Sequence, residues 1–301
     1  MNNFLKFDIK DKIVVRSPQK KILPLIVSSP HSGRNYPPDF VAASALTPLR
    51  LRSSEDSFVE DIFSYAPDLG ASLIQALFPR VFVDVNRQPY ELDPTMFSDP
   101  LPHYVITQNS RISAGLGTIA RVVSNGERVY KNKLTFQEAE ERINHFYRPY
   151  HDALQTLINN TKDEFGYCIL LDCHSMPSGR IGTNNPSQSK PSRLAEIVLG
   201  DCHGTSCHPH IMKSSNEFLT GCGFSVRRNI PYAGGFITRN YGKPKEGVHA
   251  LQIELNRALY MDEQYIEPLE GIKPLRHAMT GFMEQLGNLV ISDMGYKEAA
   301  E

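Results

Sequence analysis

The sequence predicts an α/β fold in which helices cover both faces of a central sheet. Segments typical of strands alternate along the chain with segments typical of helices. The run Tyr167–Ser175 is apolar on both faces, which is the pattern of a buried central strand. The 301 residues suffice for one large core, and no repeat or low-complexity linker divides them. We therefore expect a single domain over residues 1–301.

The first half of the chain contains two expected strands and two expected helices. Lys21–Ser29 is a short apolar run that stops at Pro30, and Pro79–Arg87 alternates and is rich in valine, so both indicate strands. Ser54–Ala66 has apolar residues at three- and four-residue steps, which predicts a helix. Thr135 and Glu138 form a capping-box pattern. The helix that begins there is expected to run through residue 158, with a kink at proline 149.

The second half continues the alternation. Further strands are expected at Ala195–Gly200, Gly223–Asn229 and Val248–Arg257. The apolar spacing of Asp262–Ile291 predicts a helix. The polar loop Ser178–Arg193 follows a candidate active-site strand, and we interpret it as a functional loop within the domain.

Charge and composition exclude several classes of protein. The chain has 32 Lys and Arg against 33 Asp and Glu, so dedicated nucleic-acid binding is not expected. Its N-terminus lacks the apolar run of a signal peptide, and its apolar runs fall short of the ~18 residues that span a membrane. Its five cysteines are an odd number, which argues against a disulfide framework. We expect a soluble cytoplasmic protein without a membrane partner.

Chemistry-bearing side chains follow the expected strands. His31 and His174 each come after an apolar strand, Asn86 and Arg87 end another, and Glu254 lies near the end of a late one. Ligands of α/β sheets bind beyond the carboxyl ends of strands. Two imidazoles and an acid can bind Zn²⁺, while a second carboxylate and a guanidinium serve proton transfer and charge stabilisation. The pattern favours a metal-assisted hydrolase, although a single His after a strand is more often a hydrogen-bonded loop residue.

Six segments in order resemble the N-formylglutamate amidohydrolase family, whose distant relatives are the zinc carboxypeptidases and aspartoacylases. The segments are PHSGRNYPPDF (Pro30–Phe40), SEDSFVEDIF (Ser54–Phe63), PRVFVDVNRQPYELDP (Pro79–Pro94), LLDCHSMPS (Leu170–Ser178), PYAGGFITRNYGKP (Pro231–Pro244) and HALQIELNRALYM (His249–Met261). The resemblance implies a three-layer α/β/α fold of the phosphorylase/hydrolase type with a mixed central sheet.

The resemblance also implies one Zn²⁺ per chain, bound by His31, Asp56 and His174. The wide spacing between His31 and Asp56 departs from that of zinc carboxypeptidases, so Glu55 stays open as the acidic ligand. Taken alone, Asp56 would also fit the N-cap of the expected helix.

The resemblance makes Glu254 the general base and Arg87 the group that stabilises the oxyanion or holds a substrate carboxylate, with Asn86 beside it. The structural alternative for Arg87 is an ion pair with Asp84 or Glu91. Weaker substrate-binding candidates, each of which could equally be a surface residue, are Arg80, Arg121 and Arg239.

The expected activity is hydrolysis of a small N-acyl acidic amino acid. The family implies N-formyl-L-glutamate as substrate, formate and L-glutamate as products, and the last step of one histidine degradation route. Two alternatives remain open: the same chemistry on an N-acetyl amino acid or a peptidoglycan-type amide, and a metal- or ligand-binding protein without turnover. Mixed His/carboxylate sites accept several divalent metals, and neither the metal nor the oligomeric state follows from the sequence.

Overall fold

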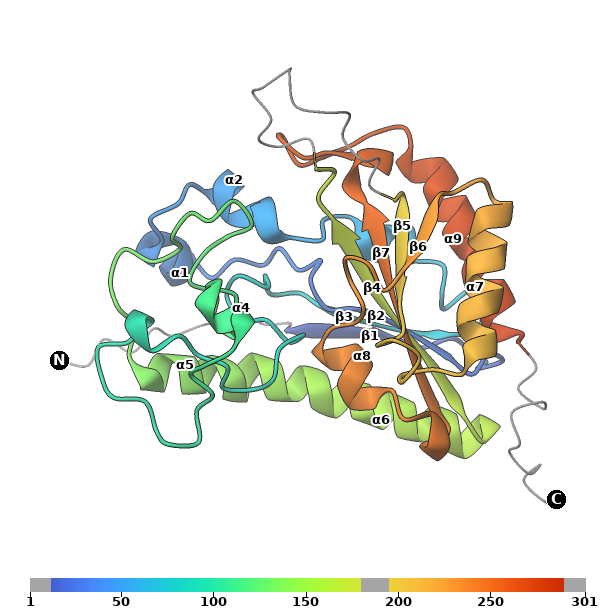
Figure 1. The fold of residues 1–301 in the computed structure, drawn as a ribbon, viewed down its shortest axis with the longest axis horizontal. Coiled ribbons are helices and arrows are strands. Elements are labelled where there is room, and N and C mark those ends of the chain that lie inside the picture. The colour runs from blue at the N-terminus through green and yellow to red at the C-terminus, as the bar shows by residue number, and fades with distance from the viewer. Residues whose placement is uncertain (1–11, 180–194, 290–301) are drawn as a thin grey trace. The chain divides into compact units, whose positions relative to one another are not determined.

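The computed structural model describes residues 12–179 and 195–289. Its main sheet has seven strands in the order β1-β3-β2-β4-β7-β5-β6 (Figure 1). These strands are β1 (Ile13–Arg16), β2 (Leu25–Ser29), β3 (Ser72–Ala76), β4 (Cys168–Met176), β5 (Ile197–Gly200), β6 (Val226–Arg228) and β7 (Val248–Asn256). The pairs β2–β4, β4–β7 and β5–β6 are parallel, whereas β5 runs antiparallel to β7. The mixed sheet that the sequence predicts is therefore confirmed.

The chain divides into two compact units. Unit 1 comprises Met1–Val15, Pro30–Ser57 and Ile74–Gln155, and unit 2 comprises Arg16–Ser29, Phe58–Leu73 and Thr156–Glu301. The expectation of one domain over residues 1–301 stays a prediction.

Unit 2 has its own hydrophobic core on one face of β4 and β7. Residues at alternate positions of both strands lie in this core: Leu171, Cys173, Leu251, Ile253 and Leu255. The helices that pack over them are α3 (Val59–Ile62), α7 (Pro209–Gly221) and α9 (Ile272–Gly287). The short helix α8 (Phe236–Tyr241) packs against the same strands and contacts Asp172, a residue of the alternate set. Because strand side chains alternate, α8 covers the opposite face, which gives three layers.

Unit 1 contains short helices joined by long connections. They are α1 (Pro38–Ala43), α2 (Pro48–Leu51), α4 (Ser110–Ser113) and α5 (Phe136–Arg142). The capping box of Thr135 and Glu138 is confirmed at the start of α5. A π-helical turn, Ile143–Tyr147, then leads into α6 (Arg148–Phe165), which begins in unit 1 and ends in unit 2. The wider turn precedes proline 149, which cannot donate a backbone hydrogen bond.

The expected strand Pro79–Arg87 is wrong. The segment forms turns, with the backbone N–H of Phe82 donating to the carbonyl of Pro79 at 3.0 Å. The Asp84 side chain accepts from the backbone N–H of Asn86 at 2.8 Å, a local bond that competes with strand pairing. Asn86 and Arg87 therefore follow a turn, and the strand of this region is β3, which precedes the segment.

The expected helix Ser54–Ala66 is reduced to the single turn α3. Phe58 precedes it with a φ of 67°, a left-handed conformation that a helix cannot continue through. Phe58 occupies the N-cap position, so Asp56 is not the cap of this helix.

The remaining strands and the C-terminal helix form close to the expected positions. The predicted helix Asp262–Ile291 begins later, at Ile272, because a small hairpin of β8 (Met261–Asp262) and β9 (Glu267–Pro268) precedes it. Most of the predicted loop Ser178–Arg193, and residues 290–291, lie outside the described residues.

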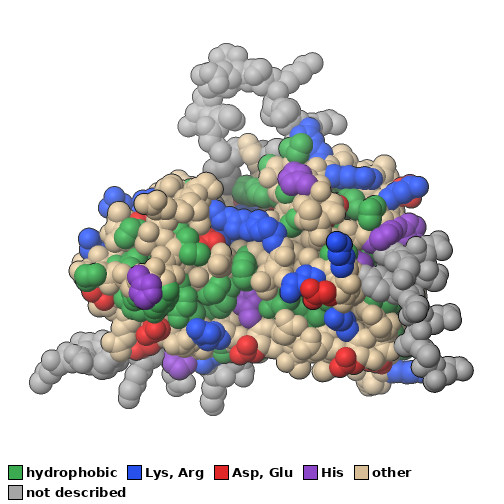
Figure 2. All heavy atoms as spheres, turned by 60° about the horizontal axis from the view of Figure 1, so that its bottom comes forward, with side chains coloured by type: hydrophobic (Ala, Val, Ile, Leu, Met, Phe, Trp, Pro, Cys, Tyr) green, Lys and Arg blue, Asp and Glu red, His purple; other side chains and the backbone are tan. Residues whose placement is uncertain are grey.

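Acidic and basic side chains are mixed on the face drawn in Figure 2, as the near-zero net charge leads one to expect. None of the helices that the structure describes combines the length and the apolar character needed to cross a membrane.

Candidate metal centre

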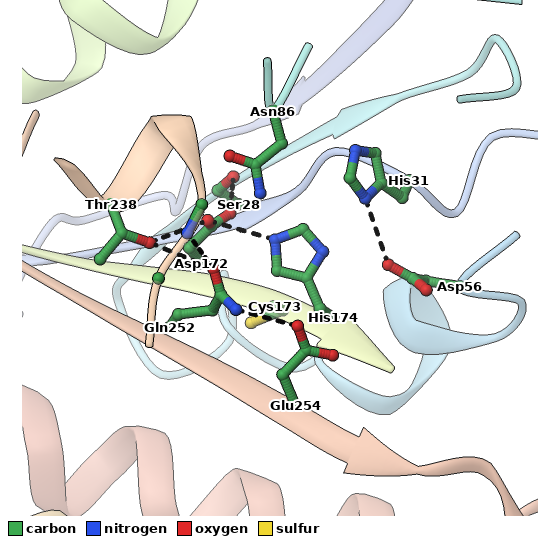
Figure 3. Close-up of polar contacts among 12 residues, drawn as sticks. Ser28, His31, Asp56, Asn86, Asp172, Cys173, His174, Thr238, Gln252 and Glu254 are labelled. Atoms are coloured by element: carbon green, nitrogen blue, oxygen red, sulfur yellow. Dashed lines mark hydrogen bonds and ion pairs between the residues drawn. The ribbon is translucent and has the colours of Figure 1, made fainter. Parts of the chain in front are cut away.

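In unit 1, His31 is held by a buried aspartate. The His31 side chain is 1% exposed, and its Nε2 lies 2.7 Å from Oδ1 of Asp84. A hydrogen bond of this length to a carboxylate favours the tautomer with the proton on Nε2. The other ring nitrogen, Nδ1, lies 3.4 Å from Oδ2 of Asp56 (Figure 3). In this tautomer Nδ1 of His31 carries a lone pair, and Nδ1 is the ring nitrogen that lies beside Asp56.

Asp56 and its neighbour Glu55 have different surroundings, although both are 1% exposed. The backbone N–H of Asp56 donates to the carbonyl of His31 at 3.0 Å, which brings the two distant sequence positions together. Both oxygens of Glu55 accept hydrogen bonds, and the donors are Tyr36, Arg52 and Ser57. Burial and the nearby Glu55 carboxylate raise the pKa of Tyr36 well above its ordinary value. Glu55 thus serves a structural ion-pair network, and Asp56 is the acid that faces His31.

Two arginines of unit 1 lie beside the Asp84 carboxylate. Arg80 donates to its Oδ2 at 2.9 Å, and an Arg87 nitrogen lies 3.6 Å from the same oxygen. Burial alone would raise the pKa of Asp84. Arg87, the His31 contact and Arg80 together outweigh burial and hold the pKa well below its ordinary value. Asp84 is therefore a carboxylate that fixes His31 and the two arginines around one point.

Arg87 and Arg80 both have structural partners. Arg87 donates to the backbone carbonyls of Leu116 and Asn86, at 2.8 and 2.9 Å. Burial lowers the pKa of Arg87, and the Asp84 charge opposes that change. Arg80 also lies 4.0 Å from Asp56, so its guanidinium spans the two acids.

In unit 2, His174 has a partner of the same kind. It lies on β4, is 3% exposed, and its Nε2 lies 3.1 Å from Oδ2 of Asp172. Asp172 is two residues earlier on the same strand, so the two side chains project from the same face. Its other oxygen accepts from the Ser28 hydroxyl at 3.2 Å. Both predicted histidine ligands therefore carry a buried carboxylate on Nε2.

Glu254 lies on β7 in unit 2, directly across from His174 in the parallel β4–β7 register. Its side chain is among the buried polar groups of the strand, at 7% exposure. The Gln252 amide donates to Oε1 of Glu254 at 2.9 Å. A buried acid on a central strand thus accepts a hydrogen bond from a neutral amide.

The other two arginines lie in different surroundings. Arg121 pairs with Asp93 at 2.7 Å and lines a basic cavity in unit 1 that includes none of the other predicted site residues. Arg239 is exposed on α8 in unit 2, where it donates to the carbonyl of Gly234 at 3.2 Å. The structure therefore does not group Arg121 with His31 and Asp84.

Sequence reasoning named Asp84 only as an ion-pair partner of Arg87, a pairing that the structure contains at 3.6 Å, and it missed the contact of Asp84 with His31 as well as Asp172 and Gln252. Asp172 and Gln252 carry a simple signal, because each precedes a predicted site residue by two positions on a strand, and such residues share a face. Asp84 carries no such signal, because it lies in a turn that its own side chain helps to form.

The donor set defines what the protein could bind. His31 and Asp56 in unit 1, and His174 in unit 2, are buried side chains of the types that can bind a metal ion. Imidazoles backed by carboxylates, together with an acid, are the ligands of many metal sites in hydrolases. The mixed sheet and these side chains define an α/β protein of hydrolase type with a candidate metal centre.

The chain belongs to the N-formylglutamate amidohydrolase family, whose model matches residues 23–261. An N-formylglutamate deformylase of Pseudomonas aeruginosa is 31% identical over 246 residues, which cover 80% of this chain and 84% of that protein. An N-formylglutamate deformylase of Pseudomonas putida is 29% identical over 80% of this chain and 83% of that protein.

Solved structures agree with this assignment. The crystal structure of an N-formylglutamate amidohydrolase from Ralstonia eutropha JMP134 superposes with a TM-score of 0.85 at 35% identity, covering 93% of this chain and 98% of that one. A gene product of Agrobacterium tumefaciens, at 18% identity and a TM-score of 0.66 over 95% of each chain, shares the fold.

Proposed function

We propose that this chain is a metal-dependent amidohydrolase that converts N-formyl-L-glutamate and water to formate and L-glutamate. The observation that carries the proposal is the buried aspartate on Nε2 of each predicted ligand, Asp84 on His31 and Asp172 on His174. Histidine ligands of metal sites use such carboxylate partners to fix the tautomer and the ring orientation. The names of the relatives from the two Pseudomonas species support the substrate.

One Zn²⁺ per chain would be held by His31, Asp56 and His174. The donor set fits this ion, because the Nε2–H tautomer leaves Nδ1 of each imidazole as the ligand atom and Asp56 adds a carboxylate. When bound, the ion would polarise the formyl carbonyl and lower the pKa of a water molecule. No other metal set is needed for the proposed reaction.

Glu254 is the general base of the proposal. Its carboxylate accepts a proton from water as the water oxygen bonds to the formyl carbon. It then delivers that proton to the amide nitrogen as the carbon–nitrogen bond breaks. The second proton of the water also passes to the released amine, so the products are formate and L-glutamate with a protonated amino group. The Gln252 donor stabilises the ionised form of Glu254, which is the form that can accept a proton.

The arginines of the proposal bind the negative charges of substrate and transition state. Arg239 is exposed and donates to the carbonyl of Gly234, so its other donors can bind a substrate carboxylate. Arg80 and Arg87 are held by Asp84 and supply positive charge at a fixed place, with Asn86 beside them. Arg121 is left out, because Asp93 holds it at a separate cavity.

The test is formate release from N-formyl-L-glutamate together with the metal content of each variant. His31→Ala and His174→Ala should each lose more than about nine-tenths of both bound metal and activity. His249→Ala is the matched control, because His249 is equally buried and lies on β7 outside the proposed site. Full metal content and activity in both ligand variants would end the proposal. Release of acetate from N-acetyl-L-glutamate, in place of formate, would move the substrate to the larger acyl group.

A further inference from the structure

Two rows of polar side chains cross from β4 to β7 on one face of the sheet. In the parallel register Asp172 lies opposite Gln252, and His174 lies opposite Glu254. Each pair on one strand is two residues apart, so all four side chains project from the same face (Figure 3). The front row holds the predicted metal ligand and base. The row behind it holds Asp172 and Gln252, whose side chains contact His174 and Glu254 respectively.

The Gln252 amide is fixed in one orientation. Its Oε1 accepts the backbone N–H of Gly235 at 2.6 Å, and a backbone N–H can only donate. The amide nitrogen must therefore be the atom that faces Glu254, where it donates to Oε1 at 2.9 Å. This contact cannot be reversed by flipping the amide without losing the bond to Gly235.

Thr238 of α8 connects the two residues of the back row. Its hydroxyl lies 3.4 Å from Oε1 of Gln252 and 3.3 Å from Oδ2 of Asp172. A hydroxyl has one proton, so these two long contacts share it and are individually weak. Thr238 and Asp172 are fully buried and Gln252 is 4% exposed, so water does not easily replace these bonds.

We propose that Gln252 is a positioning residue for Glu254, and that Thr238 joins it to the Asp172–His174 pair in one buried polar chain. A glutamate side chain has three rotatable bonds, and a donor on one oxygen fixes the plane in which the other oxygen lies. A base displaced by about 1 Å costs about 10²-fold in rate. The proposal rests on the proposed function, in which Glu254 is the base.

The geometry separates this role from a purely structural one. Gln252 also holds Gly235, the residue that precedes α8, and α8 carries the candidate substrate residue Arg239. If Gln252 served only to hold α8, its loss would weaken substrate binding and raise KM. If it positions Glu254, its loss lowers kcat while KM stays near the parent value.

The first test is Gln252→Met, which keeps the length of the side chain and removes both polar atoms. Kinetics with N-formyl-L-glutamate should show kcat lowered about 10- to 100-fold and KM within about twofold of the parent. Gln75→Met is the matched control, because Gln75 is a buried glutamine on β3, outside the polar chain. Its kcat should equal that of the parent.

The second test uses Thr238, in case Gln252→Met does not fold. Thr238→Val replaces the hydroxyl with a methyl group of similar size and should lower kcat about threefold or more. Thr238→Ser keeps the hydroxyl and should have a kcat near the parent value. Thr161→Val is the control, because Thr161 is equally buried and its hydroxyl bonds to Leu157 within α6. It should lose similar thermal stability and keep the parent kcat.

The outcomes separate the two proposals. If the parent releases no formate, the proposed function fails, and the positioning role falls with it. If the parent is active, the positioning role alone is overturned by an unchanged kcat in Gln252→Met or a rise confined to KM. It is also overturned if Thr161→Val loses as much activity as Thr238→Val, or if the kcat of Thr238→Ser is as low as that of Thr238→Val.

Discussion

Asp84→Asn tests whether the aspartate on His31 controls metal binding. The change keeps the size of the side chain and removes the negative charge of the Asp84 carboxylate. That carboxylate lies 2.7 Å from Nε2 of His31 and accepts a hydrogen bond from Arg80 at 2.9 Å. Loss of a carboxylate partner of a ligand histidine typically costs 10- to 100-fold in metal affinity. This corresponds to about 1.4 to 2.7 kcal/mol of metal-binding free energy. Because two arginines also lose their counter-charge, we expect the upper part of this range.

The measurement is competition for Zn²⁺ between the apoprotein and a chromophoric chelator, with Asp93→Asn as the control. Asp93 is also a buried aspartate of unit 1 that pairs with an arginine and accepts from a backbone N–H, but it lies outside the candidate centre. Asp93→Asn should bind Zn²⁺ as the parent does. Parent-like affinity in Asp84→Asn, measured on folded protein, would refute the reasoning that Nε2 of His31 depends on this carboxylate.

Three further predictions follow from the site and its supports. Glu254→Gln should lower kcat by at least about 10²-fold with unchanged metal content, measured by elemental analysis, and retained turnover would remove Glu254 as the base. Gly33→Ala should lower both the midpoint temperature of thermal unfolding and the Zn²⁺ affinity, because the added Cβ would lie 2.2 Å from the carbonyl oxygen of Phe78. Values equal to those of the parent would show that the backbone shifts to accept the Cβ. Burial, with a contribution from His208, lowers the pKa of His249 from its ordinary 6.5 to about 4. Between these pH values the unfolded chain binds a proton that the folded chain does not, so stability should fall as the pH falls through this window. In urea unfolding at pH 7 and pH 5 this fall should be smaller in His249→Ala, and an equal fall would contradict the assignment.

The central strands of the fold could be predicted because burial on both faces leaves a direct mark in the sequence. The uninterrupted apolar runs that contain β2 and β4 are such marks. The strand prediction for Pro79–Arg87 was wrong because its valines are buried within turns, and burial alone does not require a strand. The Asp84 side chain accepts from the backbone N–H of Asn86, which favours a turn. The helix expected at Ser54–Ala66 is a single turn because Phe58 adopts a left-handed backbone conformation, which the spacing of apolar residues does not reveal.

The candidate site could be predicted in part, for a different reason. His31, His174 and Glu254 were found from their places after strands and from the family resemblance. The residues that hold them were not, because a hydrogen bond across 53 positions, such as that from His31 to Asp84, depends on tertiary structure. The role of Glu55 likewise required the structure, since only there do Tyr36, Arg52 and Ser57 converge on its two oxygens.

The most direct test of the central claim is formate release from N-formyl-L-glutamate by one protein sample before chelation, after chelation and after Zn²⁺ is restored. We predict release by the metal-loaded protein, loss of more than about nine-tenths of it on chelation, and recovery when Zn²⁺ is added back. Undiminished release by protein shown to contain no metal would contradict the claim that His31, Asp56 and His174 act by holding a metal ion.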